Sequence, residues 1–501
     1  MKRSLFFMTG LLGFLFLPMA VGEETSPATQ APGFYVGAAS CDLTPKPPVV
    51  LSGHLATLIA DKVATPLTAN VIAMESIAED GTNDYAIFVT MDTCSIRIDF
   101  YKAFCQAFEK ACPQWDVRKV ILNATHTHNA PDIRADGYYS IGRDDVMKSS
   151  VYTQFCLDRM IPAIQKAWES RTPGKYAYGL DFAVVAYNRR SVFADGHAEM
   201  YGKTNNPNFR AIEGMEDHDV GTLFFWNDQD KLIAMMVNVA CPSQENEGRL
   251  EMDADYWAPT RKMLQKKYGE DLVVLGLCGA AGDMSPHTQY RRGAEDRMSS
   301  MRKRTRVEEM ARRIVGAVDA TWEVVAGTRE VPAVMKNLYA EIELPQRKIT
   351  EQEYKSALAE ALRLEKIVAD AKPGEQTGAF SQAKWYRRVT DRWDQQQENP
   401  NQVYPTCIRV VRIGDTVLCS NQFELFTDFG VQIKARSPAR QTFIVQLSNG
   451  LVGAGTYVPS KRAVKGGGYS AIPQSNMVGP EGGQVLVEKT LEMANQLFPK
   501  K

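Results

Sequence analysis

The chain has 501 residues, a formal net charge of −1 and 44% hydrophobic residues. This near-neutral balance provides no basic surface, so neither a nucleic acid nor an anionic membrane is expected as a partner. The nine cysteines are scattered without a Cys-x-x-Cys pair. That pattern argues against a disulfide scaffold and against a structural zinc site, and an odd number leaves at least one cysteine free, ligating or intermolecular.

Residues 1–22 are predicted to be a secretory signal peptide. A charged start precedes an apolar run from Leu5 to Val21, and Ala20-Val21-Gly22 suits a signal peptidase. We therefore expect cleavage near Gly22 and a secreted or periplasmic protein. An uncleaved anchor is the alternative, although the run is slightly short for a membrane span. Residues 23–33 form a short linker, and no transmembrane segment is expected after removal of the signal.

Residues 34–501 are predicted to form a single α/β domain, with mixed β-sheets flanked by helices. Short β-branched runs predict buried strands, and apolar residues at helical spacing predict helices. In chain order these are strands at 85–92 and 117–128, a helix at 150–170, two strands within 222–240, a strand within 271–283, a helix at 306–325, a helical insertion at about 350–395, a hairpin at 407–421 turning at Gly414-Asp415, and a last helix at 482–498.

Two of the six histidines, His126 and His128, lie in the stretch "NATHTHNAP". If the predicted strand extends through them, both imidazoles point to one face at the strand's carboxyl end, where α/β sites commonly form. Imidazole is the commonest protein ligand for zinc-like metals, so a metal site is one interpretation. A pair of structural histidines is the other.

Three further stretches carry residues suited to chemistry. Ser285 follows the glycine-rich turn "CGAAGDMSP" and could be a nucleophile or a hydrogen-bond donor. Glu424 of "NQFELF" is predicted to open a helix, where a carboxylate is also favourable without any site. The glycine-rich loop at 447–471 presents Tyr457 and Tyr469.

Taken in order, these motifs resemble the neutral/alkaline non-lysosomal ceramidase family along nearly the whole mature chain. The resemblance rests on "GAASCDLTP", "NATHTHNAP", "YNRR", "CGAAGDMSP", "ELF", "YVPS" and "GGY". Members of that family are zinc amidases that cleave the N-acyl bond of ceramide. The resemblance therefore implies a ceramidase-like catalytic domain and one Zn2+ per chain.

The family's site residues can be placed on matching positions of this sequence. His126, Glu424 and Tyr457 match metal ligands, although the Tyr457 motif carries about three extra residues. Catalytic or substrate-site residues are matched by His128, Arg189, Ser285 and Tyr469. In the implied mechanism a metal-activated water attacks the amide, while His128, Arg189 and Tyr469 steady the oxyanion.

One expected ligand is missing, because the family's second zinc histidine has no counterpart in "VNVACPSQENEGRLEMDADYW". Cys241 or Gln244 could take its place, with a thiolate the better zinc ligand. Alternatively, a carboxylate oxygen of Glu245, Asp253 or Asp255 could be the replacement ligand, which would suit a harder metal. Weak metal binding with loss of catalysis is a third alternative.

The predicted function is therefore that of an exported metal-dependent hydrolase, cleaving an N-acyl amide bond of ceramide or a related lipid amide. The chain ends after the 482–498 helix, whereas longer family members continue into a C-terminal sandwich domain, so the match covers the catalytic domain only. A peripheral contact with lipid remains open. The alternative is a catalytically degenerate, ceramidase-like binding protein.

Overall fold

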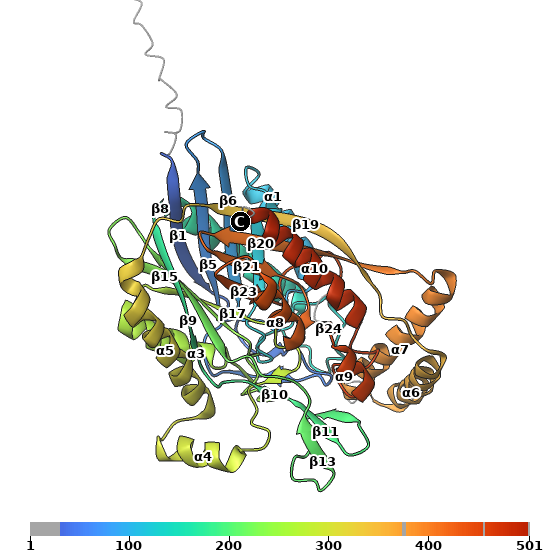
Figure 1. The fold of residues 1–501 in the computed structure, drawn as a ribbon. Helices are drawn as coiled ribbons and strands as arrows, with labels where there is room; N and C mark the ends of the chain where they lie inside the picture. Colours follow the sequence, from blue (N-terminus) through green and yellow to red (C-terminus); the bar gives the residue numbers. More distant parts are fainter. Residues whose placement is uncertain (1–30, 373–376, 454–455, 499–501) are drawn as a thin grey trace, which may run out of the picture.

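The computed structural model describes residues 31–372, 377–453 and 456–498. The predicted signal peptide and most of the predicted linker lie outside these ranges. The described chain is a mixed α/β fold in which helices cover several mixed sheets, as the sequence predicts (Figure 1). In the described parts of the chain, no helix has the length and apolar character needed to cross a membrane.

Three larger sheets form the centre of the fold. The first has the order β7-β6-β5-β1-β8, the second β17-β15-β14-β9 and the third β19-β20-β21-β23. Their strands are β1 (Gly33–Asp42), β5 (Thr68–Ile77), β6 (Asn83–Met91), β7 (Val120–Ala124), β8 (Thr172–Pro173), β9 (Lys175–Phe182), β14 (Asp219–Trp226), β15 (Leu232–Val239), β17 (Val273–Cys278), β19 (Met335–Pro345), β20 (Val403–Ile413), β21 (Thr416–Ser420) and β23 (Gln441–Val445). Most neighbours are antiparallel, but each sheet holds one parallel pair: β6 with β7, β15 with β17, and β21 with β23.

Short strands form further small sheets of two or three strands. They are β2 (Val49–Val50) with β3 (Ile59–Ala60), β4 (Lys62–Val63) with β16 (Glu251–Met252), β10 (Tyr187–Asn188) with β18 (Met284–Ser285), β22 (Glu424–Leu425) with β24 (Tyr457–Val458), and the set of β11 (Arg190–Phe193), β12 (Ala198–Met200) and β13 (Phe209–Ile212).

The helices cover the outer faces of the sheets. Helix α2 packs on sheet one and also contacts α1. Helices α3 and α5 pack on sheet two, and helices α8 and α10 pack on sheet three (Figure 1). Their bounds are α1 (Ile98–Ala111), α2 (Ser149–Glu169), α3 (Trp257–Tyr268), α5 (Arg306–Val325), α8 (Thr427–Arg436) and α10 (Pro480–Leu497). Helices α6 (Glu351–Asp370) and α7 (Thr377–Glu398) occupy the predicted insertion and lie together at the side of the molecule (Figure 1). The remaining helices of the described residues are α4 (Arg292–Met301), α9 (Lys461–Gly466) and the 3-10 turns Val117–Lys119 and Ala326–Thr328.

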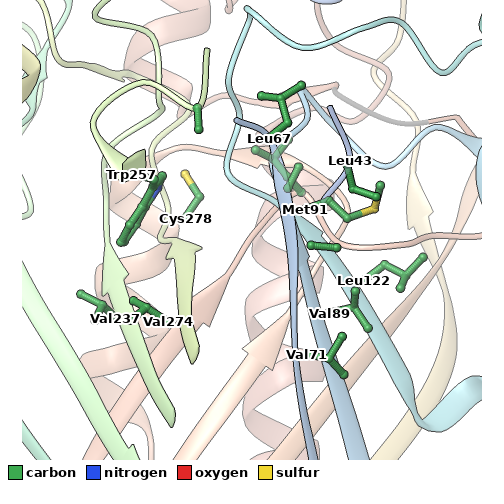
Figure 2. Close-up of a cluster of buried hydrophobic side chains, with 14 of the residues drawn as sticks. Leu43, Leu67, Val71, Val89, Met91, Leu122, Val237, Trp257, Val274 and Cys278 are labelled. Atoms are coloured by element: carbon green, nitrogen blue, oxygen red, sulfur yellow. The ribbon is translucent and has the colours of Figure 1, made fainter. Parts of the chain in front are cut away.

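Alternation along the strands divides their side chains between two buried layers. Val71, Val89 and Leu122 sit in register across β5, β6 and β7, within one hydrophobic cluster (Figure 2). Their sequence neighbours Ile72, Phe88 and Ile121 belong to another cluster, which also takes Leu223, Met236 and Leu275 from sheet two and Val411, Leu418 and Phe443 from sheet three. The shared cluster holds the three sheets in a fixed relation, since burying each such side chain contributes about 1.5–3 kcal/mol.

The loops that follow the three parallel pairs hydrogen-bond to one another. The Ser243 amide donates to the Thr125 carbonyl at 3.3 Å, and the Gln446 amide donates to the Cys278 carbonyl at 3.0 Å. The Asn449 amide donates to the Leu122 carbonyl at 3.1 Å. Residues that follow β7, β15, β17 and β23 are thus brought to one place by the backbone. All nine cysteines lie in the described ranges, and none of them forms a disulfide.

Candidate metal and catalytic site

The two neighbouring histidines lie in a loop and not on a strand. Strand β7 ends at Ala124, and His126 adopts a left-handed backbone with φ of 70°. The predicted strand at 117–128 is therefore too long at both ends, and strand alternation does not orient these rings. They converge because the Thr125 and His126 amides donate to the Met91 and Thr93 carbonyls of the adjoining β6 end. The His126 and His128 ring centroids lie 5.0 Å apart.

The buried His126 ring faces a buried carboxylate. Its Nδ1 contacts the Cys94 carbonyl oxygen at 2.5 Å, which makes Nδ1 the donor nitrogen and leaves an acceptor lone pair on Nε2. That Nε2 lies 3.2 Å from Glu424 Oε2, also an acceptor. Burial lowers the pKa of His126, but Glu424 and Cys94 outweigh it and raise the pKa to about 10. Two facing acceptors require a proton or a cation between them.

Glu424 lies in the short strand β22, and helix α8 begins three residues later at Thr427. The expectation that Glu424 opens a helix is therefore wrong. Parallel pairing of β22 with β24 instead places Glu424 in register with Tyr457. Burial raises the pKa of Glu424, but His126 and a hydrogen bond from Tyr457 hold it below its usual value.

Arg189 lies beside Tyr457. Its guanidinium donates to the Gly282 carbonyl at 2.9 Å and lies 5.4 Å from the centroid of the Tyr457 ring. A Cβ at Gly282 would meet the Glu424 carbonyl oxygen at 2.4 Å, so the glycine allows this close approach. The ring of Tyr469 meets that of Tyr457 edge-on, with centroids 5.6 Å apart.

His128 is held by two residues of the segment where a histidine was expected. Its Nδ1 lies 3.1 Å from Glu247 Oε2, and its Nε2 lies 2.8 Å from the terminal amide nitrogen of Gln244. Burial lowers the pKa of His128, but Cys94 and Glu247 raise it to about 9. Burial raises the pKa of Glu247, whereas hydrogen bonding to His128 lowers it to about 2. Of the two proposed substitutes, Gln244 reaches the site.

Ser285 lies in strand β18 and is fully buried. Its hydroxyl oxygen is 3.0 Å from the Tyr201 hydroxyl and accepts the His287 amide at 3.1 Å. Among the described residues, those are the hydrogen-bond partners of the Ser285 side chain. No imidazole is placed to take its proton, so the geometry favours a positioning role over a nucleophilic one.

Most of the predicted site residues line one cavity of about 120 Å³: His126, His128, Glu424, Tyr457 and Tyr469. Cys94, His54, Tyr138, Trp385 and several arginines complete its wall. Arg189 reaches this group through Tyr457, whereas Ser285 is not among the lining residues. The cavity therefore joins loops after β6, β7, β21 and β23 with the insertion helix α7.

Two sets of residues could hold a cation here. Within the described ranges, one group of three or more His, Cys, Asp or Glu has all its ligand atoms within 4.8 Å of one another: Cys94, His126 and His128. The Cys94 sulfur lies 4.0 Å from His126 Nδ1, however, and that nitrogen already donates to the Cys94 carbonyl. The Nε2 of His126 faces Glu424 instead, and Glu424 is hydrogen-bonded to Tyr457, so these three residues fit a zinc-like ion better.

Cys241 is directed into the core. Its buried thiol donates to the Val185 and Pro242 carbonyls, each at 3.5 Å, and burial raises the pKa of the thiol well above its usual value. The acidic alternatives are also engaged elsewhere. Glu245 pairs with Arg306, Asp253 accepts from Thr65 and Asn246, and Asp255 accepts two backbone amides.

Replacing Cys241 with alanine is therefore expected to leave zinc affinity within about threefold of the wild type. The change should cost about 1–2 kcal/mol of stability, as a small core truncation does. Isothermal titration of metal-free protein with zinc measures the first quantity, and urea unfolding measures the second. A loss of affinity by tenfold or more would assign Cys241 to the metal.

Sequence reasoning missed Cys94, Glu247, Tyr201 and the insertion residues Trp385 and Arg388. A signal existed for Cys94, because it follows the predicted strand at 85–92. Carboxyl ends of adjacent parallel strands meet at one edge of a sheet, so Cys94 belongs beside His126 once β6 and β7 pair. No comparable signal places Trp385 or Arg388, whose position depends on how α7 docks.

No protein-family model matches the sequence, and no curated protein sequence matches it. The fold is nonetheless similar to solved structures. A neutral ceramidase from Pseudomonas aeruginosa superposes with a TM-score of 0.64 at 15% sequence identity, covering 94% of this chain and 76% of the other. A ceramidase complexed with C2 superposes with a TM-score of 0.62 at 14% identity and the same coverage. The chain therefore has a ceramidase-like fold.

Proposed function

We propose that this protein is a metal-dependent hydrolase that cleaves an N-acyl amide bond of a lipid amide, such as ceramide, with one zinc ion per chain. The observation that carries the proposal is the Nε2 of His126, which faces the Glu424 carboxylate at 3.2 Å in a cavity wall. Tyr457, in register with Glu424, would be the third ligand. The ceramidase-like fold supports the same class of reaction.

A divalent ion bound there would supply Lewis acidity, which polarises an acyl carbonyl and makes water a better nucleophile. The residues around it have separate tasks. Tyr469 lines the cavity beside Tyr457 and can donate a hydrogen bond to the developing oxyanion; one such donor is typically worth about 3–4 kcal/mol. Arg189, which lies 5.4 Å from the centroid of the Tyr457 ring, can help to hold Tyr457 in place. His128, steadied by Glu247, can pass a proton to the leaving amine.

Export and contact with lipid belong to the same proposal. A chain cleaved near Gly22 would act outside the cytoplasm, and a lipid amide would be taken from a surface or a micelle rather than from free solution. The cavity opens beside the insertion helix α7, which supplies Trp385 to its wall.

Purified protein expressed with added zinc is expected to contain about one zinc ion per chain and to release fatty acid from a short-chain ceramide. Chelation should remove the metal and lower the rate at least about 100-fold, and added zinc should restore both. Elemental analysis and a fatty-acid assay make the two measurements. Absence of metal together with absence of hydrolysis would favour the ceramidase-like binding protein instead.

A further inference from the structure

The metal-site cavity continues into a second hollow of about 650 Å³. Arg97, Arg134, Tyr138, Arg388, Thr456 and Met477 line both spaces and therefore form the passage between them. Ile98, Tyr404, Pro405 and Val452 add apolar surface to the outer hollow. A substrate that reaches the metal site from this hollow must pass the arginines.

Two arginines of the passage, Arg134 and Arg388, differ in their partners. Arg134 pairs with Asp132 at 3.4 Å. Arg388 is accessible within the passage and, among the described residues, has no ion pair and no hydrogen bond. Partial burial, and then the like charges of Arg134 and Arg97, lower the pKa of Arg388.

The carboxylates of the outer hollow, Asp99 and Asp136, hydrogen-bond to other groups, and neither forms an ion pair with Arg388 in the described parts of the chain. Asp99 accepts the Ala135 amide at 3.2 Å, and Asp136 accepts the amide and hydroxyl of Ser150 at 3.0 and 2.6 Å. The wall of the inner cavity contains one carboxylate, Glu424, which faces His126.

Helix α7 is anchored on both sides of the passage, so Arg388 is held there. The Lys384 ammonium donates to the Gly137 carbonyl at 3.2 Å, and Arg392 donates to the Pro473 and Asn476 carbonyls, each at 2.8 Å. Because Lys384, Arg388 and Arg392 are spaced by four, they share one helix face. The adjacent Arg387 lies on another face and pairs with Glu365 of α6.

We infer that the substrate is an N-acyl amide carrying an anionic group, such as an N-acyl amino acid, whose anion binds Arg388 and Arg134 while its acyl chain fills the outer hollow. This inference rests on the proposed amidase function. Guanidinium groups bind carboxylates and related oxyanions through paired, charge-assisted hydrogen bonds. A neutral amide would leave Arg388 without a counter-charge.

The experiment compares amides that share a dodecanoyl chain and differ in the amine: N-lauroylglycine, N-lauroyltaurine and the neutral N-lauroylethanolamine. The zinc-loaded wild type should hydrolyse an anionic amide with kcat/KM at least about tenfold above the neutral one. Arg388→Gln should lower that ratio at least tenfold, and Arg388→Lys should retain part of it. Arg387→Gln, on the same helix but directed at α6, should leave the ratio unchanged. A higher kcat/KM for the glycine amide shows that the site prefers a carboxylate, and a higher kcat/KM for the taurine amide shows that it prefers a sulfonate.

Failure of the proposed function can be separated from failure of this inference. An analogue of N-lauroylglycine with an ether in place of the amide is titrated into the full chain by calorimetry, with its methyl ester as the neutral partner. Tighter binding of the acid, lost in Arg388→Gln, supports the anion site even if no amide is hydrolysed. Equal binding of acid and ester, or hydrolysis of neutral and anionic amides at equal kcat/KM, overturns the inference.

Discussion

His126→Ala is expected to lose the bound metal and to lower amide hydrolysis at least about 1,000-fold. The substitution removes the nitrogen that faces Glu424 at 3.2 Å and leaves that buried carboxylate with its hydrogen bond from Tyr457 alone among the candidate ligands. The remaining candidate ligands, Glu424 and Tyr457, cannot form the three-ligand protein set typical of catalytic zinc sites. Elemental analysis of the purified variant, with zinc titration by calorimetry, measures the loss of metal separately from the loss of rate.

The matched control is His197→Ala. His197 is exposed and pairs with Asp195 and Glu199 on the surface, so its removal should leave metal content and rate unchanged. A His126→Ala protein that is folded by circular dichroism and still holds one zinc per chain would place the metal elsewhere. The Cys94, His126 and His128 group would be excluded by the same result, because it also depends on His126.

The strands and helices that sequence patterning predicted best are those whose burial is regular. The hairpin turning at Gly414 is an example, since β20 and β21 alternate between two buried layers and Gly414 adopts the positive φ of 54° that its turn needs. The same reasoning failed at His126, which follows the end of β7 by two residues, and at Glu424, which lies in a two-residue strand between irregular segments. The spacing of hydrophobic residues along the sequence does not predict the backbone path of such irregular segments.

The site residues were named by motif resemblance, but their arrangement depends on contacts that no single motif contains. His126 comes from the end of sheet one, while Glu424 and Tyr457 come from the short β22–β24 pair near sheet three. Pairing of strands distant in sequence decides this geometry. The missing histidine is similar: the motif "NVACPSQ" does not show whether Cys241 or Gln244 turns toward His128, because the path of the loop after β15 decides which side chain does so.

Arg190→Leu is expected to destabilise the protein by about 3–5 kcal/mol, the typical cost of breaking one side of a buried ion pair. The Arg190 guanidinium is fully buried, bonds both carboxylate oxygens of Glu213 at 2.7 and 3.1 Å, and donates to the Tyr469 carbonyl at 2.9 Å. It also donates to the Ala463 and Gly467 carbonyls. Leucine would leave a buried carboxylate unpaired and would release the loop that carries Tyr469.

Urea unfolding of Arg190→Leu, Glu213→Leu and the double variant separates these effects. If the unpaired Glu213 charge causes most of the loss, the double variant should be more stable than Arg190→Leu, because removing both charges removes the buried, unpaired carboxylate. Arg436→Leu is the control, since its pair with Glu488 is exposed and such pairs are worth at most about 1 kcal/mol. A double variant no more stable than Arg190→Leu would instead assign the loss to the three loop carbonyls. Tyr469 would then depend on Arg190 for its place in the cavity, and the rate of hydrolysis in the double variant should fall with its stability.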